Sequence, residues 1–108
     1  MDAAVEPTKA ARRMDAASRR WIERLGGVGP GREAAIAELH DLLLRAASFE
    51  VGRRCASLPQ FRGGDQRDIA QQSADDALVA ILGKLDDFRG ESRFTTWAYK
   101  FALYEAAA

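Results

Sequence analysis

Hydrophobic residues recur at helical spacing in four segments of the chain, and each segment predicts one helix. The first covers residues 14–25 and places its apolar side chains near one side of a short amphipathic helix: Met14, Trp21, Ile22 and Leu25. The sequence GGVGPG follows directly, and we expect its glycines and Pro30 to end this helix.

The second predicted helix is longer and covers residues 32–58. Its apolar positions repeat every three or four residues: Ile36, Leu39, Leu43, Ala47, Val51, Cys55 and Leu58. Pro59 is expected to end it, because proline lacks a backbone N–H and clashes with the preceding turn.

The third predicted helix runs from residue 65 to about residue 85, with Asp65 as its N-terminal cap. One side is expected to face inward, where either Ile69 or Ala70 is followed by Ala74, Ala77, Leu78, Ile81, Leu82 and Leu85. The opposite side, which we call the acidic stripe, consists of Gln72, Asp75, Asp76 and Val79. A fourth helix is predicted to begin near Phe94, with Ser92 as its cap.

The pattern predicts an all-α fold, a compact bundle of three to four helices, because no segment alternates between apolar and polar residues over strand length. A chain of 108 residues with 47% hydrophobic and 30% charged residues has the composition of one small folded domain. We expect that domain to cover residues 32–108. Residues 1–31 are expected to form a leader that is disordered in residues 1–13 and contains the short first helix and the glycine-rich linker.

Charge and cysteine content restrict the partners and the location of the chain. Sixteen Lys and Arg residues balance sixteen Asp and Glu residues, so any contact with nucleic acid must come from a local cluster of cations. The single cysteine, Cys55, cannot form an internal disulfide, which favours a reduced, intracellular setting. No apolar run approaches the length of a membrane span, so we expect a cytoplasmic protein without a membrane partner.

Recognised catalytic motifs are absent from the sequence, including those of metalloproteases, phosphate-binding loops, paired cysteines and serine hydrolases. Asp75 with Asp76 and Asp86 with Asp87 are neighbouring carboxylates, but adjacent helical residues point about 100° apart and do not converge on a proton or a metal. We therefore expect no enzyme activity, no catalytic residue, no metal and no cofactor.

The C-terminal segment, residues 88–108, contains six of the nine aromatic residues of the chain. Three cations lie between them: Arg89, Arg93 and Lys100. Rings that stack on bases and cations that neutralise phosphates are typical of a surface for single-stranded nucleic acid. The pattern alone favours packing in the core, because one helix face carries Phe94, Trp97 or Ala98, and Phe101.

Within this segment, the run LDDFRGESRFTTWAYKFAL, Leu85 to Leu103, resembles the second conserved region of bacterial RNA polymerase sigma factors of the extracytoplasmic-function group. Seven residues stand at the family's spacing in a loop and the helix after it: Phe88, Arg89, Gly90, Ser92, Phe94, Thr96 and Trp97. A gap-free alignment places Asp75 and Asp76 at the family's Gln-Glu pair, whereas residues 68–72 resemble the same motif displaced by one helical turn. The resemblance covers roughly residues 30–108.

The resemblance implies a promoter-recognition domain that performs no covalent chemistry. In this family the domain docks on a coiled coil in the largest subunit of the RNA polymerase core and captures flipped minus-ten bases from the non-template single strand. It assigns ten residues of this chain to DNA binding: Phe88, Arg89, Gly90, Glu91, Ser92, Arg93, Phe94, Trp97, Lys100 and Tyr104. It assigns polymerase binding to the acidic stripe, and it implies an anti-sigma factor as a further partner, since such inhibitors commonly cover that surface.

The sequence departs from the family pattern at several points. Tyr104 stands where many members have Asn, and Phe101 replaces a common aliphatic residue. The chain stops inside a helix that continues into basic residues in the family, and it contains no second helix-turn-helix domain for the minus-thirty-five element. We therefore expect a truncated fragment of a longer factor.

The residues leave other interpretations open. Without the resemblance, the residues of the acidic stripe favour a solvated face. Trp97 serves either as a strand-separating wedge or as a core residue that braces the loop. The alternative function is a helical protein-interaction module without DNA binding, in which the stripe binds a partner and the C-terminal aromatics only form core.

Overall fold

Asp15 caps the first helix within residues 14–56 and 63–107, the part of the chain that the computed structural model describes. Its carboxylate accepts a hydrogen bond of 2.7 Å from the backbone N–H of Ser18 and so caps helix α2 (Ala16–Gly26). At the other end, the backbone N–H of Gly27 donates to the carbonyl oxygen of Arg24. The helix predicted over residues 14–25 is confirmed with slightly shifted ends. The disorder expected in residues 1–13 lies outside the described residues.

Helix α3 (Pro30–Cys55) begins earlier than predicted. Gly29 has φ of 80°, a left-handed conformation that favours glycine, and Pro30 occupies the first helical turn. The sequence predicts that the glycines and Pro30 end the preceding helix, but α2 already ends at Gly26 and Pro30 instead begins α3. Proline is tolerated there because the N–H groups of the first turn have no partner within the helix and because the fixed φ of proline matches the helical value. The predicted end of this helix at residues 58 and 59 lies outside the described residues.

Helix α4 (Gly63–Gly83) is followed by a short 3-10 turn, η2 (Leu85–Asp87), and by helix α5 (Phe94–Ala107). Asp65 lies in the first turn of α4 and not ahead of it, so its prediction as the cap is wrong. Its negative charge still lies near the positive end of the helix dipole. Residues 14–56 and 63–107 contain helices and no strand, which confirms the all-α prediction.

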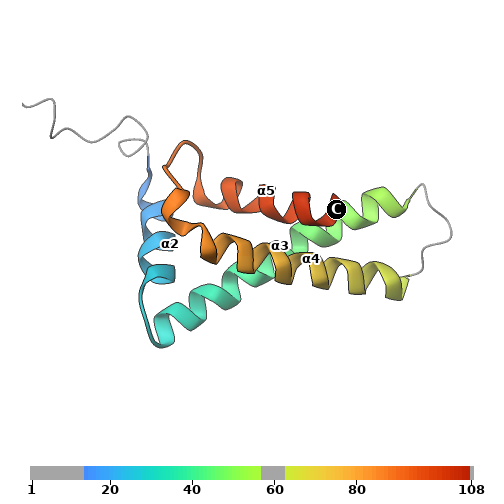
Figure 1. Ribbon diagram of the computed structural model, residues 1–108, viewed down its shortest axis with the longest axis horizontal. Helices are drawn as coiled ribbons and strands as arrows, with labels where there is room; N and C mark the ends of the chain where they lie inside the picture. The colour runs from blue at the N-terminus through green and yellow to red at the C-terminus, as the bar shows by residue number, and fades with distance from the viewer. Residues whose placement is uncertain (1–13, 57–62, 108) are drawn as a thin grey trace, which may run out of the picture.

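The four α-helices of residues 14–56 and 63–107 pack around a main apolar core, and a smaller buried cluster joins α3 to α4 through Ala47, Val51, Cys55 and Ala70. Helix α3 crosses behind α4 and α5, which run side by side, and α2 lies at one end of this bundle (Figure 1). Half of the main buried cluster is alanine, which allows helices to approach closely. Its members are Leu25, Ala35, Leu39, Leu43, Ala46, Ala74, Ala77, Ile81, Phe88, Phe94, Ala98 and Ala102. Within the described ranges, no helix combines the length and apolar character needed to cross a lipid bilayer.

The inward face predicted for α4 is confirmed. Ala70, Ala74, Ala77 and Ile81 are buried. The face therefore begins with Ala70 and not with Ile69, which is exposed. Leu78, Leu82 and Leu85 are partly buried against the same core. The spacing of small and large apolar residues therefore fixed the rotation of this helix correctly.

Helix α2 belongs to this core although it precedes the predicted domain boundary at residue 32. Leu25 is fully buried, and Met14, Trp21 and Ile22 pack partly buried against the cluster. Two hydrogen bonds of 3.0 and 2.6 Å between the Arg24 guanidinium and the Glu38 carboxylate join α2 to α3. Apolar packing and this ion pair together hold α2 on the bundle.

Phe94 is the largest fully buried side chain. Its ring centroid lies 5.4 Å from that of Trp21 in α2, 5.5 Å from that of Phe88 and 5.6 Å from that of Trp97. Stacked and edge-on aromatic pairs at such distances add to the free energy gained from burial alone. Phe94, at the start of α5, thus joins α2 and the segment that follows η2 in one aromatic cluster.

Replacing Phe94 with Ala is expected to lower the free energy of unfolding by about 3–5 kcal/mol, because it leaves a cavity at the centre of this cluster. Tyr104→Ala is the matched control, since Tyr104 is an aromatic residue of the same helix and is 73% exposed. The control should change stability by no more than about 0.5 kcal/mol. Urea unfolding followed by circular dichroism measures both, and equal losses would contradict a central role for Phe94.

Candidate nucleic-acid interface

The segment from Phe88 to Phe94, here called the capture loop, is fixed mainly at its two ends. At its start, the Phe88 N–H donates to the Leu85 carbonyl oxygen at 3.1 Å. In the middle, Gly90 is buried and has φ of 77°, a backbone conformation that would be strained in any residue with a side chain. At its end, the Phe94 N–H donates to the hydroxyl oxygen of Ser18 at 2.9 Å, 76 positions earlier in the chain.

The prediction that Ser92 caps α5 is wrong. The Ser92 hydroxyl donates to the carbonyl oxygen of Arg93, its immediate neighbour, at 3.1 Å. Arg93 occupies the cap position, since its carbonyl accepts the first helical bond from the Trp97 N–H at 3.0 Å. The N–H of Phe94, which has no partner within the helix, is therefore satisfied from α2 and not from the loop.

A pocket of about 160 Å³ opens on the capture loop. Its lining combines rings, cations, carboxylates and a hydroxyl: Asp87, Phe88, Arg89, Glu91, Ser92, Trp97 and Lys100. The ring centroids of Phe88 and Trp97 lie 5.2 Å apart and form an aromatic wall. Arg89 and Lys100 are exposed, and neither makes a salt bridge with any residue that the structure describes. The pocket thus offers a stacking surface, free cations and hydrogen-bond acceptors within one small volume.

The structure brings six of the ten predicted DNA-binding residues together in this pocket: Phe88, Arg89, Glu91, Ser92, Trp97 and Lys100. Gly90 lies in the turn of the loop and supplies no side chain. Phe94 is fully buried, so it supports Phe88 and Trp97 from behind and has no surface to offer a base. Core packing therefore explains Phe94, whereas Trp97 is partly buried and serves both the core and the pocket.

Arg93 does not line the pocket on the capture loop. It lines a hollow of about 200 Å³ on the α2 side, together with Asp15, Ala17, Ser18, Trp21, Phe94 and Thr95. Arg89 and Arg93 therefore lie at different hollows and do not form a single cationic clamp.

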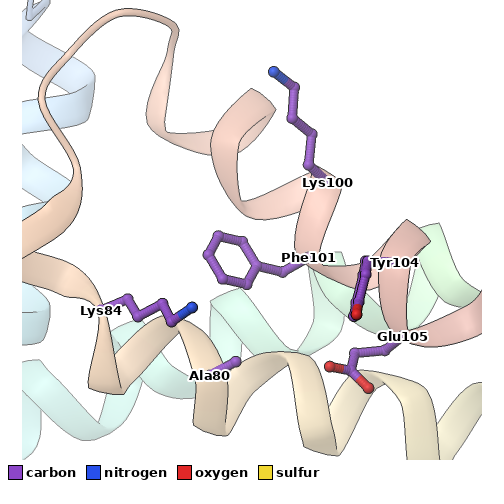
Figure 2. A pocket seen from close by; sticks show the side chains of 6 residues that line it. All are labelled: Ala80, Lys84, Lys100, Phe101, Tyr104 and Glu105. Atoms are coloured by element: carbon purple, nitrogen blue, oxygen red, sulfur yellow. The ribbon is translucent and has the colours of Figure 1, made fainter. Parts of the chain in front are cut away.

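Tyr104 lies in a groove of about 320 Å³ between α4 and α5, lined by Ala80, Lys84, Lys100, Phe101, Tyr104 and Glu105. Figure 2 shows the Phe101 ring and the Lys84 chain in the space between the two helices, whereas Lys100 points away from it. Lys100 lines both this groove and the loop pocket, so the two hollows adjoin at that residue. Lys84 was missed by the sequence analysis because it lies outside the aromatic segment, although it precedes that segment by only a few residues.

The acidic stripe on α4 is exposed as predicted, but its members do not all face the same way. Asp75 Oδ1 lies 2.7 Å from His40 Nε2 of α3 and accepts a bond of 3.3 Å from Gln71, so it belongs to the contact between the two helices. Gln72 donates to Asp76 at 3.0 Å, and Val79 is 71% exposed. Gln72, Asp76 and Val79 are the part of the stripe that is free to meet a partner.

Asp15 supports the capture loop indirectly through Ser18. The Ser18 side chain, and after it the Ser18 backbone N–H, lower the pKa of Asp15 below the usual value of 3.8, with smaller contributions from Arg93 and Arg19. Ser18 was not among the predicted site residues, because a hydroxyl that binds a backbone group so far along the chain leaves no local sequence signal.

Comparisons with family models, with curated proteins and with solved structures found no match to this chain.

Changing Asp15 to Asn should destabilise the protein at neutral pH and have no effect in strong acid. Asn keeps the capping oxygen but removes the charge that Ser18 stabilises. Because the folded-state pKa is lowered, this stabilisation is present above pH 3.8 and is lost as the pH falls through the folded-state value. Urea unfolding of the wild type and the variant across this range measures the difference, with the exposed Glu23→Gln of the same helix as control. A difference that stays constant with pH would contradict the role of the charge.

Proposed function

We propose that this chain is a promoter-recognition domain similar to the second conserved region of extracytoplasmic-function sigma factors. Its function is to bind the RNA polymerase core and to capture a flipped base from the non-template strand of the minus-ten element. The observation that carries this proposal is the pocket on the capture loop, with an aromatic wall and two unpaired cations at the motif that carries the resemblance. Such a domain acts by binding, without a covalent step, and works in the bacterial cytoplasm.

The pocket supplies each contact that base capture requires. Extruding a base costs a few kcal/mol, and stacking on an aromatic side chain returns about 1–3 kcal/mol per base. The partly buried Trp97, beside the buried Phe88, provides the stacking surface, while Arg89 and Lys100 can meet the flanking phosphates. Asp87, Glu91 and Ser92 offer oxygens that accept hydrogen bonds from the amino group of a base.

The strand is proposed to continue from the pocket past Lys100 into the groove between α4 and α5. Lys84 and Lys100 make no salt bridge within the described part of the chain, and Tyr104 exposes its ring there. Because these groups adjoin the pocket, they can bind the nucleotides next to the captured base, and the DNA strand need not change direction. Arg93, on the α2 side, lies off this path.

The polymerase contact is proposed on Gln72, Asp76 and Val79. An exposed carboxylate and amide accept hydrogen bonds from Arg side chains on a coiled coil, and the exposed Val79 adds apolar area between them. Asp75 is turned toward His40 and supports the stripe from the side. An anti-sigma factor that covers this surface is a further proposed partner.

A protein-interaction module without DNA binding is the second candidate. The full burial of Phe94 and the exposure of Val79 favour it, since they place one aromatic in the core and an apolar residue on the acidic stripe. The two candidates differ at Arg89 and Lys100, which only a DNA-binding domain needs.

DNA capture is tested with short fluorescent oligodeoxythymidine strands whose central base is A, C, G or T, each also annealed to its complement. We expect binding to prefer single strands and to differ among central bases. Arg89→Ala should weaken binding by roughly tenfold and reduce the slope of log affinity against log salt by about 0.7, the value for one lost phosphate contact.

Arg67→Ala is the matched control, because Arg67 is an exposed arginine near the start of α4. At 1.5 Å per residue it lies about 24 Å along the helix from Gly83, the end of α4 that leads to the capture loop. It should leave affinity and base preference unchanged. Equal binding to single strands and duplexes, or equal losses for Arg89 and Arg67, would favour the interaction module.

Polymerase binding is tested with the purified RNA polymerase core. Asp76→Lys should weaken binding by at least roughly tenfold, because it places a cation where arginines of the coiled coil are expected. Asp68→Lys is the control, since Asp68 is an exposed carboxylate of the same helix and belongs to the displaced alignment of the family motif. Loss of binding only in Asp68→Lys would move the contact about two turns toward the start of α4.

A further inference from the structure

The end of the capture loop is held by a residue from outside the segment that resembles the sigma-factor family. Among the described residues, Ser18 is the only side chain from another element that is hydrogen-bonded to residues 88–94. Its oxygen receives the N–H of Phe94 at 2.9 Å, and Ser18 is itself only 2% exposed. The bond is therefore shielded from water, which would otherwise replace it.

Helix α2 also braces the loop through ring contacts. Trp21 lies one turn after Ser18 and stacks on Phe94, with an angle of 20° between the ring planes. Phe94 in turn contacts Phe88 and Trp97, the two rings that form the wall of the pocket. A continuous path of contacts thus runs from α2 to the surface on which a base would stack.

We propose that α2 is part of the base-capturing site and that Ser18 is a positioning residue, whose hydroxyl fixes the Phe94 amide and thereby the spacing of the pocket wall. This inference rests on the proposed function, since positioning matters only if the pocket binds a base. Ser18 does not touch the nucleotide and acts only through Phe94.

The chemistry of the bond explains why a hydroxyl is needed. With Ala at position 18, the buried N–H of Phe94 loses its acceptor. It can form a new hydrogen bond only with water, which requires the loop to open. Thr keeps the hydroxyl, and the hollow of about 200 Å³ beside Ser18 leaves space for its methyl group. Asp15 supports this arrangement by capping α2 at Ser18 itself.

The test compares Ser18→Ala, Ser18→Thr and the matched control Ser73→Ala. Ser73 is 5% exposed and lies on α4, away from the loop. The first readout is the rate of amide hydrogen exchange. The increase that Ser18→Ala causes in residues 89–94, as a ratio to the wild type, should be roughly ten times the increase in residues 74–81. The second is the ratio of affinities for the best and the poorest of the four oligonucleotides, which should fall by about the same factor. Ser18→Thr should restore both.

Two results would overturn the inference: equal behaviour of Ser18→Ala and Ser73→Ala in both readouts, or faster exchange in the loop without any change in the affinity ratio. A wild-type protein that does not distinguish among the oligonucleotides overturns the proposed function, and with it the role of Ser18 in base capture. Exchange data would then still report whether Ser18 holds the loop, so the two failures are distinguishable.

Discussion

The burial of Phe94, with its N–H bound to Ser18, is the constraint on which the rest of the structure depends. The residue begins α5, ends the capture loop and receives the stacked ring of Trp21 from α2. Because one ring fills the space where these three elements meet, none of them can move far without opening the core. The pocket lined by Phe88 and Trp97 is therefore shaped by interior packing.

Helical periodicity was sufficient to predict the fold class and the buried face of α4, because a repeat of three to four residues depends only on local geometry. Features that depend on distant residues were not predictable in this way. Ser92 has the usual chemistry of a cap, yet the acceptor at the start of α5 is Ser18, and no spacing rule links those two positions. Phe94 and Trp97 share a helix face, but the ring of Trp21 from α2 stacks on Phe94, which is buried completely, whereas Trp97 is only partly buried.

The charge balance of the chain hides an uneven distribution. Several cations are paired within the bundle, as Arg24 is with Glu38, Arg45 with Asp41, and Arg53 and Arg54 with Glu50. Lys84, Arg89 and Lys100 are unpaired in the described part of the chain and gather around the capture loop and the groove beside it. Asp87, Glu91 and Glu105 line the same two hollows, so these cations can meet phosphates one by one but do not form a net positive surface.

Energetics limit what the pocket can do by itself. Stacking of one base returns about 1–3 kcal/mol, which is similar to the few kcal/mol that flipping the base costs. Capture of a single base is therefore close to balanced, and net affinity must come from contacts outside the pocket. Lys84 and Tyr104 in the adjoining groove are placed to supply them along the strand. The exposed face at Gln72, Asp76 and Val79 is placed to supply them through a protein partner. In the proposed function, the domain would therefore bind a strand firmly only together with its protein partner, which is what a promoter-recognition domain that acts within a polymerase requires.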